Sequence, residues 1–484
     1  MQVDFGLLLP EFLLAGLGVL LLVVDFSVPW RSRRAQNAWL AAIAVAGLAV
    51  VFAVAVVTQR DVWETLYEDL VLVDRYALLF KALFTAAGAA TVLISVDYVY
   101  RRMRHPGEFY ALVAFVVLGA DLMASAGELL TAYIAVELLT FCLYVLVALT
   151  RGDGRSAEAA AKYILLGAIS SALMLFGIAV LYGATGETAF EPLGRAIIGP
   201  FGPTIALGLG LFFAGLGFKL SMVPFHLWAP DVYEGAPTPV TAIVAVLSKA
   251  AAFALVLRFL ALAGEWTVDE WRLPLAVLAA LTMTVGTLTA LAQENIKRLL
   301  AYSSIAQVGF VLVGVVSLNE SGANAVLLHL VGYAFTNLAA FAVVIIVEAK
   351  TGREGIADYA GLASRSPFLA MVLASALFSL AGLPIFAGFI TKFLLFTAAV
   401  EADLTWLMVV AVVNSLISLY YYIRIIREMY VGEAPDEGRL PLSIVASIPV
   451  WLLFAGTVLV GVYPAPFMEA IDAATNVLPP FWGE

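Results

Sequence analysis

Long apolar runs recur along the whole chain and are separated by short polar breaks. A helix needs about 20 consecutive apolar residues to cross the hydrocarbon core of a bilayer. About fourteen segments, called helices 1 to 14 below, meet this condition: 6–24, 38–58, 76–98, 108–126, 129–149, 159–183, 203–226, 238–262, 273–292, 298–317, 323–348, 367–395, 404–428 and 441–463. The runs are continuous and do not alternate as the strands of an outer-membrane barrel do. The pattern therefore predicts an all-α polytopic membrane protein with a single transmembrane domain over residues 1–484.

The composition supports a membrane protein and excludes several other classes. Hydrophobic residues make up 63% of the chain and charged residues 13%, whereas soluble domains carry roughly 45–50% and about 25%. The single cysteine, Cys142, excludes disulfide frameworks, thiolate zinc sites and self-contained iron–sulfur clusters. His105, His226 and His329 lie far apart, so we expect no metal or cofactor site in this chain. A net charge of −10 argues against nucleic acid as a partner.

Basic residues are concentrated in the loops that follow odd-numbered helices. These loops carry Arg31, Arg33, Arg34, Arg101, Arg102, Arg104, Arg151, Arg155, Lys297, Arg298, Lys350, Arg353, Arg365, Arg424, Arg427 and Arg439. The loops on the other side hold few basic residues, among them Arg60, Arg75, Arg195 and Arg272. Because cytoplasmic loops are enriched in Lys and Arg, we expect both termini on the outer, periplasmic side.

Six basic residues lie inside apolar spans, namely Lys81, Lys162, Lys219, Lys249, Arg258 and Lys392. A basic side chain at the bilayer centre costs about 2.5–3.5 kcal/mol on insertion scales. We interpret Lys81 and Arg258, which are near helix ends, as long side chains that reach the membrane interface. Lys249 is near the centre of its span, and Lys219 and Lys392 lie near prolines within theirs. For these three lysines we expect a buried functional role.

Three further residues leave two interpretations open. Glu137 is the carboxylate placed deepest in a helix, and it either pairs with Lys219 or Lys162 or stays neutral and hydrogen-bonded to a neighbouring helix. Lys162 is close to the cytoplasmic end of helix 6, where it either reaches the interface or has a functional role. His329 either bridges two helices through a hydrogen bond or takes part in a proton relay.

Helices 7 and 12 share the motif F-x-L-x-x-x-P, and the two copies are 160 residues apart. The motif residues are Phe218, Leu220 and Pro224 in the first copy and Phe378, Leu380 and Pro384 in the second. The helix numbers of the two copies differ by five, an odd number, so the copies run in opposite directions across the bilayer. We therefore expect inverted five-helix repeats at 105–264 (helices 4–8) and 265–432 (helices 9–13). The three N-terminal helices (1–104) and the last helix (433–484) lie outside the repeats.

Proline within each copy predicts a discontinuous helix with a freed backbone carbonyl. In lipid such a break survives only where it faces protein or a water-filled cavity. Broken helices beside charges near the midplane are how secondary transporters build ion sites. The buried polar groups here are few, titratable and spread along the chain, which fits protons better than a large solute. The chain has no nucleotide or redox motif, so it either exchanges one ion for another or is driven by a partner.

Four segments carry a resemblance to a known family: FKLSMVPFHLWAPDVYEGAPTPVTA (218–242), VLSKAAAFAL (246–255), ENIKRLLAYSSIAQVGF (294–310) and SLAGLPIFAGFITKF (379–393). They resemble the proton-translocating, antiporter-like subunits of respiratory complex I, which are related to subunits of multisubunit Na⁺/H⁺ antiporters. Within this family the chain is most similar to the subunit N branch. The resemblance covers nearly the whole chain and implies two inverted repeats with discontinuous helices 7 and 12.

The resemblance also implies a role for each candidate residue. Glu137 and Lys219 would form the pair of the first half-channel, Lys249 would be the central lysine and Lys392 the lysine of the second half-channel. Supporting roles would fall to Lys162, which modulates the pair, and to His329, at a position where the family has a polar residue.

The resemblance further implies a subunit of a proton-translocating NADH:quinone oxidoreductase in a bacterial plasma membrane. Its partners would be other membrane-arm subunits, including antiporter-like paralogues, together with membrane lipid and the transported proton. NAD, FMN, iron–sulfur clusters and quinone would be held by partner subunits, with no redox centre in this chain. The alternatives are a subunit of a multisubunit Na⁺/H⁺ antiporter, a structural spacer of the membrane arm, and a ferredoxin- or deazaflavin-linked complex.

Overall fold

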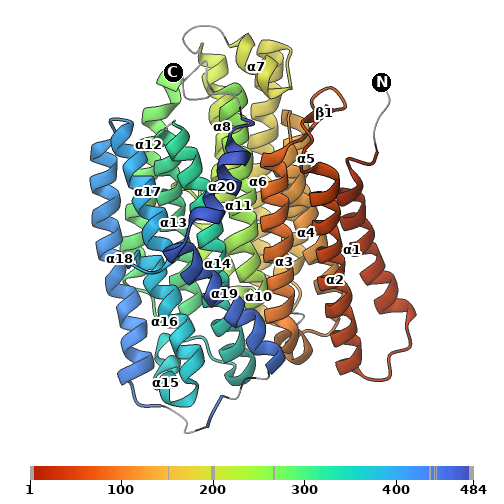
Figure 1. The fold of residues 1–484 in the computed structure, drawn as a ribbon, viewed down its shortest axis with the longest axis vertical. Coiled ribbons are helices and arrows are strands. Elements are labelled where there is room, and N and C mark those ends of the chain that lie inside the picture. Colours follow the sequence, from red (N-terminus) through yellow and green to blue (C-terminus); the bar gives the residue numbers. More distant parts are fainter. Residues whose placement is uncertain are drawn as a thin grey trace.

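The computed structural model describes residues 5–150, 152–197, 202–264, 268–317, 319–434, 438–440, 442 and 444–478. Helices run roughly along one direction and pack into a single bundle (Figure 1). The first half contains α1 (Leu9–Ser27), α2 (Arg33–Gln59), α3 (Arg75–Arg102), α4 (Pro106–Ser125), α5 (Leu129–Val147), α6 (Gly154–Thr185), α7 (Phe190–Ala196), α8 (Pro203–Leu220), α9 (Trp228–Gly235), α10 (Thr238–Ile243) and α11 (Lys249–Ala263).

The second half contains α12 (Val268–Ala290), α13 (Ile296–Ser317), α14 (Glu320–Thr351), α15 (Leu362–Arg365), α16 (Pro367–Ala381), α17 (Ala387–Glu401), α18 (Thr405–Val431), α19 (Ile444–Val462) and α20 (Ala465–Thr475). Within the described residues, 12 helices are long and apolar enough to cross a membrane, or up to 13 if α19 and α20, bent by 79°, count as one span. The remaining predicted span, 367–395, is divided into α16 and α17. The all-α polytopic prediction is therefore confirmed.

Local signals set where the helices begin. The side chain of Ser32 accepts a hydrogen bond from the Ala35 amide at the start of α2, and Asp74 caps α3 through the Ala77 amide at 2.7 Å. Each cap satisfies one of the donors that a helix start leaves free. Proline occupies the first turn of α4, α8 and α16, where its missing amide hydrogen costs nothing. The short polar stretches between the apolar runs therefore define where the spans start.

The first predicted break lies between α8 and α9. Ser221 adopts a left-handed conformation with φ of 60°, and the Met222 amide donates back to the Gly217 carbonyl at 2.8 Å. This is the hydrogen-bond pattern of a Schellman motif, which terminates a helix. The Phe218 carbonyl accepts from the Ser221 amide at 3.0 Å and also from the indole of Trp228 at 2.9 Å, so a side chain beyond the break reinforces the end of the helix.

The second break lies between α16 and α17 and has the same termination. Gly382 has φ of 90°, and the Leu383 amide donates to the Phe378 carbonyl at 3.0 Å. The two breaks have opposite directions in the bundle: α8 descends from the end that carries α7, whereas α16 rises from the end that carries α15 (Figure 1). The prediction of discontinuous helices 7 and 12 is confirmed.

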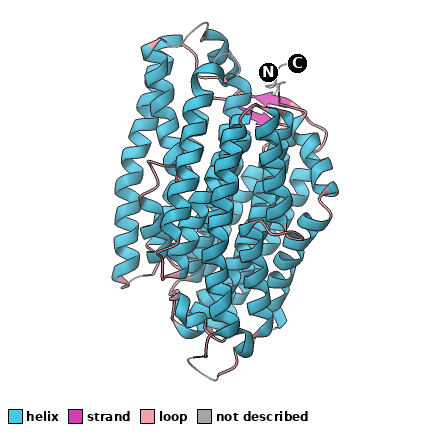
Figure 2. Ribbon diagram, turned by 90° about the vertical axis from the view of Figure 1, so that its left-hand side faces the viewer, coloured by secondary structure: helices cyan, strands magenta, loops and turns pink. Residues whose placement is uncertain are grey.

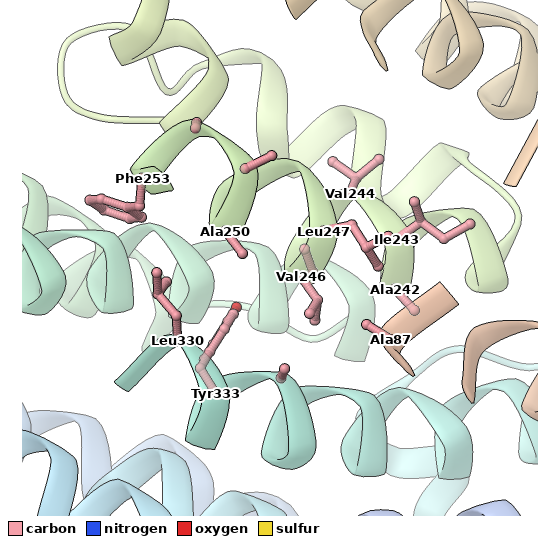
Figure 3. Packing of buried hydrophobic residues seen from close by; sticks show 14 of the residues in the cluster. Ala87, Ala242, Ile243, Val244, Val246, Leu247, Ala250, Phe253, Leu330 and Tyr333 are labelled. Carbon is pink, nitrogen blue, oxygen red and sulfur yellow. The ribbon is translucent and has the colours of Figure 1, made fainter. Parts of the chain in front are cut away.

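Helix 8, predicted as continuous, contains a turn of different winding. Residues Val244–Ser248 form a π-helical turn between α10 and α11. This turn ends directly before Lys249, the first residue of α11. Figure 3 shows Leu330 and Tyr333 of α14 and Ala87 of α3 packed beside this segment. Single π-helical turns often occur at functional sites, and the apolar pattern of this stretch did not reveal one.

A short hairpin, β1 (Glu64–Leu66) and β2 (Val71–Val73), was also not predicted. Its strands pair antiparallel, with Thr65 opposite Leu72. The hairpin lies at one end of the bundle (Figure 2), the same end as α7 (Figure 1). This end is called the upper end below, and the end with α15 the lower end. Loops after even-numbered predicted helices, such as the hairpin and the α7 segment, lie at the upper end. The α15 segment, which follows predicted helix 11, lies at the lower end, so the two sets of loops are on opposite sides, as the charge pattern requires.

Candidate functional site

Lys219 lies in the last turn of α8, directly before the first break. Its side chain is buried, and within the described part of the chain its Nζ has no hydrogen-bond partner. Nζ lies over the rings of Tyr163 and Tyr144, at 5.8 and 6.0 Å from their centroids. Tyr163 in turn stacks on Trp228 of α9 at 4.5 Å. Aromatic faces attract an ammonium group, so this pocket tolerates a charge without fixing the proton through a hydrogen bond.

Glu137 lies on α5 and is half-buried. It accepts a hydrogen bond from Ser171 of α6, whose hydroxyl also lies 3.1 Å from the hydroxyl of Tyr133. Its carboxylate is near enough to Lys219 for an electrostatic interaction, although the lysine has no hydrogen-bond partner. Glu137 also borders an apolar surface of α5 on which Ile134 is 63% exposed. Glu137 thus lies between Lys219 and the lipid- or partner-facing surface of the protein.

Lys249 lies at the centre of the bundle, where the π-helical turn meets α11. The segment Thr238–Ala263 is buried over its whole apolar window. Among described residues Nζ of Lys249 has no hydrogen-bond partner, and it lies 5.9 Å from the ring centroid of Tyr233. The hydroxyl of the preceding residue, Ser248, is likewise buried and unpartnered. Like that of Lys219, the ammonium group of Lys249 is therefore not held by a hydrogen bond among the described residues.

Lys392, on α17, is hydrogen-bonded to the backbone at the second break. Its Nζ donates to the Leu380 carbonyl at 2.8 Å and to the Ser415 hydroxyl at 3.2 Å. Gln307 of α13 donates to the same Leu380 carbonyl at 3.0 Å. Nζ also lies 4.3 Å from the ring centroid of Phe310. The carbonyl freed by the broken helix thus becomes the acceptor for a buried ammonium group.

A line of polar side chains connects the surroundings of Lys249 to those of Lys392. The hydroxyl of Tyr233 lies 3.5 Å from that of Ser304, which accepts from the Tyr333 hydroxyl at 2.9 Å. The Tyr333 ring stacks on His329, with centroids 6.2 Å apart. Nδ1 of His329 is 3.0 Å from the hydroxyl of Thr391. The sequence analysis identified His329 but missed Tyr233, Ser304 and Tyr333, which come from three different helices.

A small cavity lies along this line. It has a volume of about 10 Å³ and is lined in part by His329, Tyr333, Ser379 and Thr391. This is about the space that one water molecule needs. Within the described residues, Nε2 of His329 has no hydrogen-bond partner. The histidine therefore has a free ring nitrogen between two hydroxyl-bearing helices, an arrangement suited to passing a proton.

Lys162 lies in a charged pocket near the lower end. It forms ion pairs with Glu158 and Asp231, each at 2.8 Å, and its side chain is 43% exposed. Asp231 also pairs with Arg298 at 2.8 Å, and Arg298 with Glu234 at 2.9 Å. These residues line a pocket of about 240 Å³. Of the two partners proposed for Glu137, Lys162 is thus occupied by other carboxylates.

The interpretation of Lys81 and Arg258 as side chains that reach the interface was wrong. Both side chains are 1% exposed. Lys81 pairs with Glu11 at 2.5 Å, and Arg258 forms a two-pronged ion pair with Asp74 at 2.6 and 2.9 Å. Each carboxylate comes from a distant part of the chain, so no local pattern could reveal the pair.

Comparison with known proteins gives consistent matches over the chain. A family model described as NADH:quinone oxidoreductase/Mrp antiporter, TM, matches residues 126–418, a range that includes every candidate site residue. The chain is 40% identical over 477 residues to the NADH-quinone oxidoreductase subunit N of Desulforamulus reducens, covering 98% of this chain and 99% of the relative. The site therefore lies in the part of the chain that is shared with the family.

Solved structures show the same fold. A chain of respiratory complex I from Thermus thermophilus with bound aureothin is similar with a TM-score of 0.80 and 33% identity, over 96% of this chain and 99% of that chain. A chain of the Mrp complex from Dietzia is similar with a TM-score of 0.85 and 22% identity, over 98% and 97% of the two chains. At that identity the second likeness concerns the fold alone.

Proposed function

The chain belongs to the family of NADH:quinone oxidoreductase and Mrp antiporter transmembrane subunits, and on this premise we propose the route that a proton takes through it. It is an antiporter-like subunit of a proton-translocating NADH–quinone oxidoreductase, a multi-pass protein of the bacterial plasma membrane that works with other subunits of the complex. The proposed route runs through Glu137, Lys219, Lys249 and Lys392. The observation that carries it is the line of polar side chains between Lys249 and Lys392.

The route begins at the charged pocket of the lower end. Asp231 lies in this pocket on α9, directly beyond the first break, and pairs there with Lys162. A proton that enters here meets Lys219, whose buried ammonium group has no hydrogen-bond partner among the described residues. Lys162 has a supporting role, because its ion pairs hold the pocket together while it remains partly exposed.

The transfer from Lys249 to Lys392 follows the polar line. Tyr233, Ser304 and Tyr333 provide hydroxyl groups that both donate and accept hydrogen bonds, and His329 provides a ring nitrogen that binds and releases protons near neutral pH. Thr391, bonded to His329, directly precedes Lys392. His329 thus supports the transfer between the two lysines.

The energy for pumping comes from outside this chain. Moving one charge across 100 mV costs about 2.3 kcal/mol, and quinone reduction in partner subunits provides it by changing a charge along the membrane arm. In this proposal a neighbouring subunit covers the exposed apolar flank of α5, and the half-buried Glu137 beside this flank receives the change. The interaction between Glu137 and Lys219 then strengthens or weakens, and the proton affinities of Lys219 and Lys249 change in turn.

The proposal also covers the topology of the chain and its partner subunits. The inverted repeats span 105–264 and 265–432, and both termini lie on the periplasmic side. NAD, FMN, iron–sulfur clusters and quinone belong to partner subunits, and lipid covers the exposed apolar surface. The alternative, a subunit of an Mrp-type antiporter, is supported by a likeness in fold at 22% identity, whereas a curated subunit N relative is 40% identical over nearly the whole chain.

Substitution of Lys219 in the assembled complex, reconstituted in liposomes, tests the route. Loss of a positioned proton-transfer group typically slows a reaction by about 10²–10⁴-fold, so we expect Lys219→Ala to lower proton pumping by about tenfold or more. Lys219→Arg should be equally defective, because arginine keeps its charge but does not release a proton. Proton uptake driven by quinone reduction is the measurement.

Lys162→Ala is the control, since its ammonium group lies in the partly exposed pocket. This variant should lose less pumping activity than either Lys219 variant. Full coupled activity in Lys219→Ala would refute the assignment, and full activity in Lys219→Arg would reduce Lys219 to a fixed charge.

A further inference from the structure

A second group of buried titratable residues lies outside the central route, in the N-terminal helices. Glu11 is in the first turn of α1, Gln59 is the last residue of α2, Lys81 is in the second turn of α3 and Asp121 is in the last turn of α4. Because these helices alternate in direction, all four positions fall at the same level near the upper end. Each of four helices thus contributes one polar side chain to a common buried cluster.

Lys81 is at the centre of this N-terminal cluster. Its Nζ lies 2.5 Å from Oε1 of Glu11 and donates to Oε1 of Gln59 at 2.9 Å. Gln59 is fully buried and donates onward to the Leu7 carbonyl at 2.6 Å, directly before α1. The ammonium charge of Lys81 is therefore balanced by Glu11, and Gln59 connects the cluster to the backbone at Leu7, which is buried beneath the hairpin.

Asp121 completes the cluster and is the unusual member. Its side chain is fully buried, and neither carboxyl oxygen has a hydrogen-bond partner among the described residues. Lys81 and Glu11 are the charged groups that act on it. Ser125, one turn further along α4, is also fully buried and unpartnered. Asp121 and Ser125 are thus two buried polar side chains, four residues apart on α4, that have no hydrogen-bond partner among the described residues.

The charges in the cluster do not balance unless a proton is present. Glu11 and Asp121 contribute two carboxyl groups against the single ammonium group of Lys81. Asp74 also acts on Lys81, but it is already neutralised by its ion pair with Arg258. A buried carboxyl group without a partner takes up a proton instead of keeping its charge.

We propose that Glu11, Lys81 and Asp121 form a proton-binding site separate from the central route, in which the carboxyl group of Asp121 carries the exchangeable proton. Proton binding forms an O–H bond on a carboxylate oxygen of Asp121, and release breaks this bond and transfers the proton to a water molecule. The Lys81–Glu11 pair sets the affinity, because Lys81 favours the ionised form of Asp121 and Glu11 opposes it. The site does not depend on the route through Lys219, Lys249 and Lys392.

Infrared spectroscopy of the assembled complex tests this site. A protonated carboxyl group has a C=O stretching band that a carboxylate lacks, so the wild-type minus Asp121→Asn difference spectrum should contain such a band. Asp121→Glu should restore the band at a shifted frequency. Asp97→Asn is the matched control: Asp97 is exposed and paired with Arg101, so its replacement should leave this region of the spectrum unchanged.

Glu11→Gln distinguishes a proton site from a merely structural cluster. With Glu11 neutral, Asp121 becomes the counter-ion of Lys81, so the band should disappear although Asp121 is still present. A band that persists in Glu11→Gln, or no difference between wild type and Asp121→Asn in the assembled complex, would overturn the proposal. Proton pumping in Asp121→Asn, compared with that in Lys219→Ala, shows whether the two sites operate separately.

Discussion

The three central lysines differ in how firmly their ammonium groups are held. Lys219 and Lys249 face aromatic rings and have no hydrogen-bond partner among the described residues, whereas Lys392 is bonded to a freed carbonyl and a hydroxyl. A group without partners loses little when it releases its proton, because no hydrogen bond is broken. A bonded ammonium group holds its proton until another donor replaces it. Lys219 and Lys249 are thus suited to pass a proton on, and Lys392 to retain it before exit.

The buried pair of Asp74 and Arg258 gives a prediction for stability. Asp74→Asn keeps a residue that caps α3 well but leaves Arg258 buried without a counter-charge. Breaking a buried pair in this way costs about 3–5 kcal/mol. We expect a clear decrease in the thermal unfolding midpoint of the purified complex. Asp61→Asn is the control, because the Asp61–Arg75 pair is exposed and should contribute little.

The same pair predicts how stability depends on pH. Burial acts to raise the pKa of Asp74, but the charge and hydrogen bonds of Arg258 outweigh it and hold the pKa below the ordinary value of 3.8. The contribution of a carboxyl group with a lowered pKa is present above 3.8 and is lost as the pH falls through the lower, folded-state value. The difference between wild type and Asp74→Asn should therefore be constant near neutral pH and narrow only below 3.8. A difference that changes near pH 7 would contradict this assignment.

Some residues could be located from the sequence and others could not, for a physical reason. Lys249 and Glu137 are recognisable because a charge deep in an apolar run is expensive wherever its partner lies. The partners of Lys81 and Arg258 are 70 and 184 residues away along the chain, as Glu11 and Asp74. A position near a helix end is compatible with both a buried pair and an exposed side chain, and packing alone decides between them.

At the level of elements, the breaks in predicted helices 7 and 12 expose backbone carbonyl groups inside the bundle. Each ends with a left-handed residue, so the chain turns and presents carbonyl groups that no helix satisfies. At the second break Lys392 donates to the Leu380 carbonyl. At the first, Trp228 donates to the Phe218 carbonyl, which the Ser221 amide also caps. The proline motif made the breaks predictable. The π-helical turn before Lys249 lacks a comparable signal, because Val244–Ser248 reads as ordinary apolar helix.

Gly382 tests whether the second break positions Lys392. Its φ of 90° disfavours a side chain, and an added Cβ would lie 3.2 Å from Cδ of Lys392. Gly382→Ala should cost about 1–2 kcal/mol in backbone strain and should also displace Lys392 from the Leu380 carbonyl. We therefore expect lower proton pumping at an unchanged level of assembled complex, measured in liposomes.

Gly186→Ala is the matched control for this substitution. Gly186 ends α6 with φ of 76°, and an added Cβ would meet no atom within 4 Å. The two variants should lose similar stability, yet only Gly382→Ala should lose pumping activity. Equal activity in both variants would show that the break does not position Lys392.

At the level of the whole molecule, burial increases toward the middle of the bundle. The apolar windows of Thr238–Ala263, α13 and α14 are 100%, 94% and 89% buried, whereas those of α2, α6 and α18 are 33% buried. The centre thus carries Lys249 and His329, and the periphery carries apolar side chains for lipid or neighbouring subunits. Hydropathy predicts all these helices equally well but not which are central, because lipid-facing and protein-facing surfaces are both apolar.

The sidedness of the bundle yields the last prediction. The loops rich in Arg and Lys lie at the lower end with α15, so this end should face the cytoplasm. A cysteine at Glu187, in the exposed upper loop, should react with a membrane-impermeant maleimide added to intact cells. A cysteine at Arg353, whose side chain is 57% exposed at the other end, should react only after permeabilisation. The native Cys142 is buried and gives a low background. The opposite labelling pattern would invert the topology and place the charged pocket of Lys162 and Asp231 on the side where protons leave, which would reverse the direction of the proposed route.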